Sequence, residues 1–478
     1  MERGDFQTPP ELAARVCRFL RDTGLSPRSI IEPTCGEGNL LLAAAEAFPL
    51  AERIVAAELD WAYVQRLAAK VQQRSDRSRF EVLHGNMLDP HFASRVLDRA
   101  LPAPWLVIGN PPWVTNAAVT TLQGTNLPPK SNLDRSRGVA AVTGQSNFDI
   151  SEWILRVCAI SVAGQVGTMA MLCKSSVARR VLASLWRDEQ PLRRARVLGL
   201  DSGQAFGVSV DACLLVCEFG GGPATRDAEQ YAGWEEDSLI TRWGWRDGRL
   251  MADGNRWERT REWCVPSPLS SRRWRSGIKH DCAAVLELRH AGPHFRNGLG
   301  DIVRVEPQCL YPWLKSSDVA HGRTQEPRRW LLLPQRRTGE DTSWLMRQCP
   351  SAWEYLLAHG KRLDRRRSRI YRDRPRFAVF GVGEYSFAPW KVAISGFYKQ
   401  LRFEVVGRYE QRPMLLDDTC YFWPCTSREE AQVMLDVLHG VTAQDFLAAR
   451  IFWDAKRPVN AELLNQLDLP RLLDAERA

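Results

Sequence analysis

Four consecutive residues, Asn110, Pro111, Pro112 and Trp113, have the types best suited to chemistry in this sequence. They follow an apolar run, 105–110, with the length and composition of a buried strand. Two prolines fix the backbone, so the Asn110 side-chain oxygen and the Pro111 carbonyl are held as two acceptors. Such a pair can bind both hydrogens of a planar amino group, for example N6 of adenine, and favour a nucleophilic, pyramidal nitrogen. Trp113 can stack on a base that has left its duplex.

A glycine-rich turn forms a second candidate site. The predicted strand 29–32 ends at Glu32, and the segment 32–39 (Glu-Pro-Thr-Cys-Gly-Glu-Gly-Asn) then opens a helix. Glycines at such a place let the backbone turn sharply and approach a ligand closely. Because the segment lacks GxGxxG, it does not favour a dinucleotide.

The next two predicted strands supply matching polar residues. The strand 53–60 ends in Glu58 and Leu59, and an acid there can accept hydrogen bonds from both ribose hydroxyls. Asn86 and Met87 follow the third strand and suit the edge and face of an adenine ring. These signals together predict a site for a nucleoside-containing cofactor.

The elements around these sites alternate between strand and helix. Thr8 is expected to cap a first helix in a capping box with Glu11. The alternation predicts an α/β fold with a parallel, doubly wound sheet, whose ligands bind beyond the carboxyl ends of the strands. We predict strands at 29–32, 53–60, 81–83, 105–110, 167–173, 195–200 and 211–219.

Length and composition restrict the class of protein. The 478 residues predict two folded domains, and 44% hydrophobic with 25% charged residues are typical of a soluble, cytoplasmic protein. No apolar run has the length of a membrane span. Twelve cysteines without a CxxC pair, and eight histidines without a metal-binding pattern, predict free thiols and no metal. The net charge of +9 is compatible with a polyanionic partner.

A glycine run at 220–222, followed by Pro223, is the clearest linker, so we predict domains at 1–222 and 223–478. The second begins with a Trp-rich stretch, and its densest basic segment is 361–376. Phosphate contacts from that segment would give salt-dependent affinity for nucleic acid. The residues expected to contact DNA there are Arg365, Arg366, Arg367, Arg369 and, further on, Lys391.

Asn-Pro-Pro-aromatic after the fourth strand, preceded by Glu-Pro-x-x-Gly-x-Gly, resembles the adenine-N6 DNA methyltransferases of restriction–modification systems. The order of segments is similar to their gamma group, in which catalytic motifs precede a target-recognition domain. The resemblance implies a Rossmann-like, seven-stranded methyltransferase domain with one antiparallel strand, then a mixed α+β target-recognition domain. It also implies S-adenosylmethionine as cofactor, double-stranded DNA as partner, and a cognate restriction endonuclease in the same system. Because one turnover modifies one base, we expect the protein to act as a monomer.

Roles can be carried over residue by residue. Phe206 would pack on the second face of the flipped base, opposite Trp113. Asn86 stands where the family usually has Asp, with Asp89 as an alternative. The resemblance assigns cofactor contacts to Phe6, Thr8, Glu32, Cys35, Gly36, Glu58, Leu59, Asn86 and Met87.

The long polar segment 114–149, which includes Lys130, is predicted to be a lid that touches the target strand. Two alternatives stay open. Asn-Pro-Pro-aromatic also occurs in enzymes that methylate RNA bases or protein glutamine amides, because the two acceptors serve any planar amino group. A nucleic-acid-binding module that has lost catalysis is the other alternative.

Overall fold

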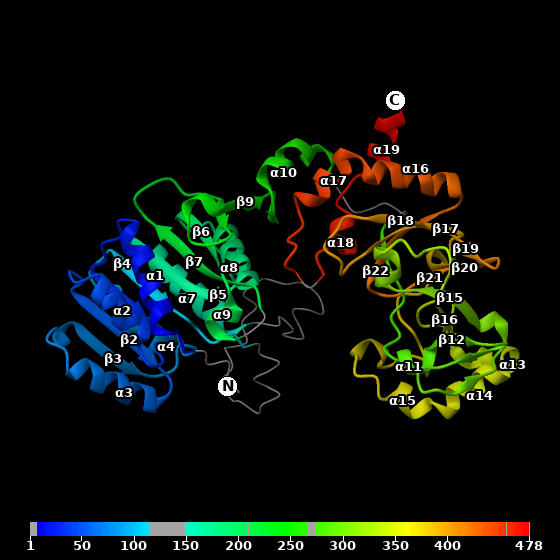
Figure 1. Ribbon diagram of the computed structural model, residues 1–478, viewed down its shortest axis with the longest axis horizontal. Coiled ribbons are helices and arrows are strands. Elements are labelled where there is room, and N and C mark those ends of the chain that lie inside the picture. The colour runs from blue at the N-terminus through cyan, green and yellow to red at the C-terminus, as the bar shows by residue number, and fades with distance from the viewer. Residues whose placement is uncertain (1–6, 115–148, 208–209, 266–272, 456, 478) are drawn as a thin grey trace. The chain divides into compact units, whose positions relative to one another are not determined.

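The computed structural model describes residues 7–114, 149–207, 210–265, 273–455 and 457–477 (Figure 1). It divides into two compact units, Met1–Gly254 and Asn255–Ala478. The predicted division after residue 222 is therefore wrong. The glycines at 220–222 form a turn inside the first unit, where Gly220 and Gly221 have φ of 79° and 75°. The chain beyond them adds strands to the edge of the same sheet.

The first unit is built on a ten-stranded sheet in the order β10-β9-β8-β6-β7-β5-β4-β1-β2-β3. Four pairs of neighbouring strands are parallel: β3 with β2, β2 with β1, β1 with β4, and β4 with β5. β7 runs antiparallel to both β5 and β6. The first seven strands form the expected Rossmann-like sheet with β7 as its one antiparallel strand. The expected total of seven strands is wrong, because β8, β9 and β10 extend the same sheet and β9 is antiparallel to both β8 and β10. The strands are β1 (Ser29–Glu32), β2 (Arg53–Glu58), β3 (Phe80–His84), β4 (Trp105–Gly109), β5 (Gly167–Lys174), β6 (Leu192–Leu200), β7 (Ala212–Phe219), β8 (Asp227–Tyr231), β9 (Leu239–Arg246) and β10 (Arg249–Met251).

Helices cover both faces of this sheet (Figure 1). Successive strand residues point to opposite faces, and neighbours such as Ile30 and Ile31 are both fully buried. That double burial explains why these strands read as continuous apolar runs. The helices are α1 (Pro10–Asp22), α2 (Asn39–Ala47), α3 (Trp61–Gln72), α4 (Pro90–Val96), α7 (Ile150–Ala163), α8 (Ser175–Arg187) and α9 (Ser202–Phe206). No helix in the described ranges is both long and apolar enough to cross a membrane.

The tryptophans expected in the second domain are shared between the two units. Trp243 is buried in β9 against Trp186, with ring centroids 5.7 Å apart, and Trp234 donates its indole N–H to the Gly199 carbonyl at 3.0 Å. Both belong to the first unit. Burial of such large side chains explains why the sheet continues past the glycine turn.

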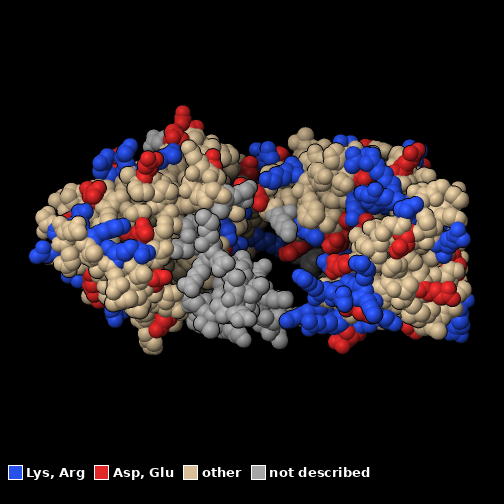
Figure 2. All heavy atoms as spheres, turned by 60° about the horizontal axis from the view of Figure 1, so that its bottom comes forward, with Lys and Arg blue, Asp and Glu red and all other residues tan. Residues whose placement is uncertain are grey.

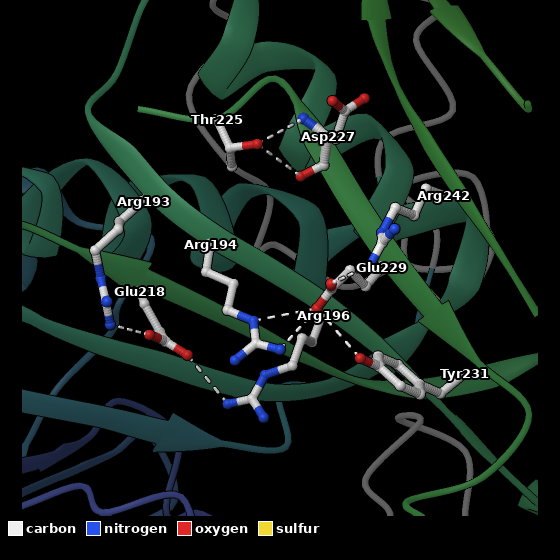
Figure 3. Close-up of polar contacts among 9 residues, drawn as sticks. All are labelled: Arg193, Arg194, Arg196, Glu218, Thr225, Asp227, Glu229, Tyr231 and Arg242. Carbon is white, nitrogen blue, oxygen red and sulfur yellow. Dashed lines mark hydrogen bonds and ion pairs between the residues drawn. The ribbon is translucent and has the colours of Figure 1, made fainter. Parts of the chain in front are cut away.

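Charged side chains join the added strands to the rest of the sheet (Figure 3). Arg194 and Arg242 lie 2.8 Å and 3.3 Å from the Glu229 carboxylate, and Arg196 lies 3.1 Å from Glu218. Each of these arginines has its carboxylate partner on a neighbouring strand. This cluster therefore stabilises the sheet and does not offer free positive charge.

The second unit is mixed α+β, as expected. A four-stranded sheet, β11-β22-β17-β18, packs against α16, α17 and the C-terminal helices, and a six-stranded sheet, β14-β13-β12-β16-β15-β21, forms a separate core. The strands are β11 (Arg275–Ser276), β12 (Glu287–Ala291), β13 (His294–Arg296), β14 (Ile302–Val303), β15 (Leu310–Leu314), β16 (Arg329–Leu332), β17 (Trp390–Ser395), β18 (Phe403–Val406), β19 (Arg408–Tyr409), β20 (Arg412–Pro413), β21 (Leu415–Leu416) and β22 (Cys420–Cys425). The helices are α10 (Gly254–Thr260), α11 (Ala283–Leu286), α12 (Ser316–Ala320), α13 (Leu345–Gln348), α14 (Pro350–Ala358), α15 (Gly360–Asp364), α16 (Arg428–His439), α17 (Val441–Ala448), α18 (Ala461–Leu464) and α19 (Leu469–Arg477).

Candidate active site

The glycine-rich turn between β1 and α2 is fixed by side chains from two other segments. The Gly36 N–H donates to the Glu58 carboxylate at 2.8 Å, and the Glu37 N–H donates to the Gln7 side-chain oxygen at 2.9 Å. Gly36 has φ of 51°, and a Cβ added there would lie 2.4 Å from that Gln7 oxygen. Only glycine fits this conformation and this approach without displacing Gln7.

Glu58 lies at the carboxyl end of β2 and organises the loops around it. Its second carboxylate oxygen accepts the N–H groups of Leu59 and Asp60 at 2.8 Å and 2.9 Å. Its backbone carbonyl accepts the Gly85 N–H at 2.9 Å, which links the end of β3 to the same point. The Leu59 side chain is 50% exposed beside this carboxylate. An acceptor next to an exposed apolar surface suits a nucleoside.

Glu32 and Cys35 lie behind the turn. The Glu32 carboxylate accepts the Leu41 N–H, in the first turn of α2, at 2.9 Å, and it is 2% exposed. Burial raises the pKa of Glu32 well above its usual value. Burial also raises the pKa of the Cys35 thiol, which keeps it protonated. In this arrangement both residues support the turn, and their predicted contacts with a cofactor remain predictions.

The residues after β3 form a tight turn. The Asn86 side-chain oxygen accepts the Leu88 N–H at 2.9 Å, and Met87 is 4% exposed. Asp89, the alternative to Asn86, caps α4 by accepting the His91 N–H at 2.9 Å. Each side chain thus accepts one backbone N–H, and the predicted contact of Asn86 with the cofactor remains a prediction.

Asn110 lies at the carboxyl end of β4. Its amide nitrogen donates to the Thr8 hydroxyl at 3.2 Å, and the Thr8 carbonyl accepts the Asn39 amide at 2.8 Å. The expected capping box at Thr8 is wrong, because α1 begins at Pro10 and has no side-chain cap. The Thr8 hydroxyl orients Asn110 instead, so that the Asn110 side-chain oxygen lies on the opposite side of the amide.

Trp113 and Phe206 come together although they are far apart in the chain. Their ring centroids are 5.2 Å apart, with an interplanar angle of 77°. Trp113 is 6% exposed, and its indole N–H donates to the Leu172 carbonyl at 3.4 Å. Pro111 and Pro112 connect this aromatic pair to Asn110. The predicted catalytic residues therefore lie in one group within the first unit.

Sequence reasoning missed three residues that hold this group: Gln7, Asp149 and Lys174. Gln7 supports the glycine turn as described above. The Lys174 ammonium donates to the Trp113 carbonyl at 2.9 Å and lies 2.7 Å from the Asp149 carboxylate. Asp149 comes directly before an apolar pattern with helical spacing, and this helix-cap signal could have been recognised in the sequence. Nothing in the sequence pairs Lys174 with Trp113. Phe6, Lys130 and residues 115–148 of the predicted lid lie outside the described residues.

The basic segment of the second unit divides into two kinds of arginine. Arg365, Arg367 and Arg369 are exposed, and no ion pair involves them within the described ranges. Arg366 is different, because its guanidinium donates to the Ala378 carbonyl at 2.6 Å and lies 3.8 Å from the centre of the Tyr371 ring. Burial lowers the pKa of Arg366. Its Nε and Nη1 groups help to hold the fold together, and the assignment of Arg366 to DNA binding remains a prediction.

Lys391 is wrongly assigned to DNA. It is fully buried in β17, and its ammonium donates to the Ala388 and Met414 carbonyls at 2.7 Å and 3.0 Å. A side chain buried to this extent cannot reach a phosphate. Residues 391–395 of β17 are all buried, with Val392 and Ile394 in one core and Ala393 in another. Lys391 therefore lies in the interior, which the sequence did not reveal for this short aromatic stretch.

Burial lowers the pKa of Lys391 to about 7. In the unfolded chain its pKa is ~10.4, so at intermediate pH the unfolded state binds one proton more than the folded state. Stability then rises with pH between about 7 and about 10. Relative to Lys391→Met, the free energy of unfolding of the parent chain should increase over that window by up to ~1.4 kcal/mol per pH unit. Denaturant unfolding of both proteins at several pH values measures this, and a pH-independent difference would contradict it.

Comparison with known proteins gives one close relative. No family model matches the chain. The type II methyltransferase M.NspV of Nostoc sp. is 39% identical over 471 residues, which cover 98% of this chain and 96% of that protein. The type IIL restriction–modification enzyme MmeI, solved in complex with DNA, matches 95% of this chain with a TM-score of 0.58 and 13% identity. This chain spans 64% of the length of MmeI, and that likeness shows the fold alone. On this evidence the chain belongs to the type II methyltransferases of the restriction–modification type.

Proposed function

We propose that the protein transfers a methyl group from S-adenosylmethionine to N6 of an adenine flipped out of double-stranded DNA. The observation that carries the proposal is the orientation of Asn110. Its nitrogen donates to Thr8, so its oxygen is directed away from Thr8 as the acceptor for an amino group, and the Pro111 carbonyl is adjacent in the chain. An acceptor pair held by a fixed backbone recognises an NH2 group with two hydrogens.

The chemistry of the donor set fits the proposed cofactor. Glu58 offers carboxylate oxygens toward a ribose, the exposed Leu59 side chain offers an apolar face for adenine, and Asn86 offers an amide for the adenine edge. Gly36 and Gln7 together fix the turn that would lie against the methionine part. When bound, S-adenosylmethionine supplies a methyl group on a positively charged sulfur, which makes it ready for attack by a neutral amine.

The protein's own contribution is to orient the amine. The N6 lone pair of adenine is delocalised into the ring, and hydrogen bonds from both amino hydrogens to Asn110 and Pro111 favour the pyramidal form that can attack. Trp113 and Phe206 would hold the base between them. Because these rings are in contact and Trp113 is nearly covered, entry of a base requires them to separate. Hydrogen bonds to Asn110 and Pro111 that strengthen as the nitrogen becomes pyramidal would accelerate the reaction, whereas contacts that hold the flipped base serve to bind it.

DNA affinity is assigned to the second unit, as a target-recognition domain. Figure 2 shows dense groups of Lys and Arg on this unit. The exposed residues Arg365, Arg367 and Arg369 can each neutralise a phosphate. Replacing all three with glutamine should weaken binding to a duplex of any sequence. The slope of log affinity against log salt should fall by about one for each phosphate that the variant no longer neutralises.

A matched control is available in the same segment. Arg376 is exposed but pairs with Asp364 at 3.0 Å, so Arg376→Gln removes a charge that is already compensated. We expect this variant to change the salt slope less than any single replacement among Arg365, Arg367 and Arg369. Fluorescence anisotropy with a labelled duplex at several salt concentrations measures both effects. Equal slopes in the parent and the triple variant would remove this surface from the DNA interface.

The proposed function is tested by methyl transfer from labelled S-adenosylmethionine to plasmid DNA grown without adenine methylation. N6-methyladenine after digestion of the product supports the proposal, and mapping the modified sites gives the specificity. Label on another base contradicts the assignment to adenine. Label only on RNA or protein, or cofactor binding without any transfer to DNA, contradicts the assignment to DNA. We further propose that the protein acts as a cytoplasmic monomer beside a cognate restriction endonuclease.

A further inference from the structure

Lys174 is the last residue of β5, the strand beside β4, and its ammonium reaches across to the segment that follows β4. It donates to the Trp113 carbonyl at 2.9 Å and lies 2.7 Å from the Asp149 carboxylate. The Lys174 side chain is 23% exposed and that of Asp149 is 3% exposed. A charge-assisted contact so well shielded from water is stronger and more directional than one at the surface.

Asp149 is itself held firmly. It caps α7, where its other carboxylate oxygen accepts the Ser151 N–H at 3.2 Å and the Ser151 hydroxyl at 2.7 Å. Directly beside it, the Ile150 N–H donates to the Val114 carbonyl at 2.9 Å. The start of α7 therefore fixes the carboxylate, the carboxylate fixes Lys174, and Lys174 fixes the backbone at Trp113.

The position of the Trp113 carbonyl affects the proposed catalytic residues, because they lie in the same short backbone segment. Asn110 lies three residues before Trp113, and Pro111 lies two residues before it. Because the two prolines restrict the backbone between them, a shift at Trp113 also shifts Asn110. The Trp113 indole N–H donates a hydrogen bond to the carbonyl of Leu172, which lies in β5 like Lys174. One strand thus positions both the backbone and the side chain at the end of the catalytic segment.

We propose that Lys174, anchored by Asp149, is a positioning residue for methyl transfer, which holds residues 110–113 in the geometry required for reaction. The inference rests on the proposed function. Lys174 is not assigned a contact with the methyl group or with the amine. Its loss would let the Trp113 carbonyl turn, and a displacement of about 1 Å at reacting groups costs on the order of 100-fold in rate.

The test compares Lys174→Met, Lys174→Arg and Asp149→Asn with the parent in single-turnover methyl transfer, with enzyme in excess over DNA and saturating S-adenosylmethionine. Lys174→Met should react roughly 10- to 100-fold more slowly, with unchanged affinity for the cofactor and for DNA. Lys174→Arg keeps the charge and should recover most of the rate. Asp149→Asn keeps the helix cap and loses the ion pair, so it should fall between them. Arg28→Met, which removes an exposed ion pair with Glu52 in the same unit, is the control and should react like the parent.

Two outcomes overturn the proposal. One is an unchanged single-turnover rate in Lys174→Met. The other is a rate that falls only together with cofactor affinity and melting temperature and is not restored by Lys174→Arg, since that pattern means general destabilisation. The product formed by the parent decides the proposed function separately. If the parent methylates another base, RNA or a protein amide, the same ratio of rates is measured on that acceptor and decides the role of Lys174.

Discussion

Asn110→Ala should lower the single-turnover rate of methyl transfer by roughly 100- to 1000-fold, the usual cost of removing one preorganised polar group at a reacting centre. The reason is that the alanine leaves only the Pro111 carbonyl to accept an amino hydrogen, so the pyramidal nitrogen is no longer favoured. In the described part of the chain, the hydrogen bond to the Thr8 hydroxyl joins Asn110 to the segment before α1, and its loss should change the affinity for S-adenosylmethionine little. Rapid-quench transfer and calorimetric titration measure the two effects separately.

Asn110→Asp provides a graded comparison, because it keeps an acceptor oxygen but loses the donor to Thr8. We expect it to retain more activity than Asn110→Ala. Gln190→Ala, which removes a side-chain amide that donates to the Asp188 carbonyl in the same unit, should behave like the parent. Loss of cofactor binding in Asn110→Ala in parallel with activity would assign Asn110 to cofactor binding. Activity near that of the parent would contradict its role in catalysis.

Glu58→Ala should have the second largest effect. We expect it to weaken the binding of S-adenosylmethionine rather than to slow the chemical step. The Glu58 carboxylate accepts the Gly36 N–H that shapes the glycine turn, and in the proposed complex it also holds the ribose. Loss of one hydrogen bond to a charged group costs about 1.5–3 kcal/mol, which corresponds to about 10- to 150-fold weaker binding of S-adenosylmethionine. Calorimetric titration with the cofactor measures this change.

Glu58→Gln is the matched variant, since it keeps the length of the side chain and one acceptor oxygen. It should bind the cofactor with intermediate affinity. Thermal unfolding of the three proteins shows whether the turn has collapsed. If Glu58→Ala bound the cofactor as tightly as the parent, Glu58 would be a support for the turn alone.

Local sequence was enough to predict a candidate catalytic segment and the first seven strands of the sheet around it. Strands buried on both faces are apolar throughout, and Ile30 and Ile31 show why such runs are visible without any knowledge of tertiary contacts. The position of Asn110 after the fourth strand is likewise local information, because the prolines that fix it are its neighbours. The Glu58 and Gly36 signals could be combined because carboxyl ends of parallel strands meet at one edge of the sheet.

Only the tertiary structure shows which polar side chains already form hydrogen bonds within the fold. Arg366 and Arg367 are adjacent and chemically identical, yet one donates to the Ala378 carbonyl and the other is exposed. The sequence predicts Lys391 as a DNA contact, but it lies in a strand that is buried on both faces and donates to two carbonyls. The glycines at 220–222 look like a linker, although the strands beyond them complete the first sheet. These errors have the same physical reason. A charged residue or a turn can be recognised from the local sequence, but its partner comes from segments distant in the chain, as the contact of Lys174 with Trp113 shows.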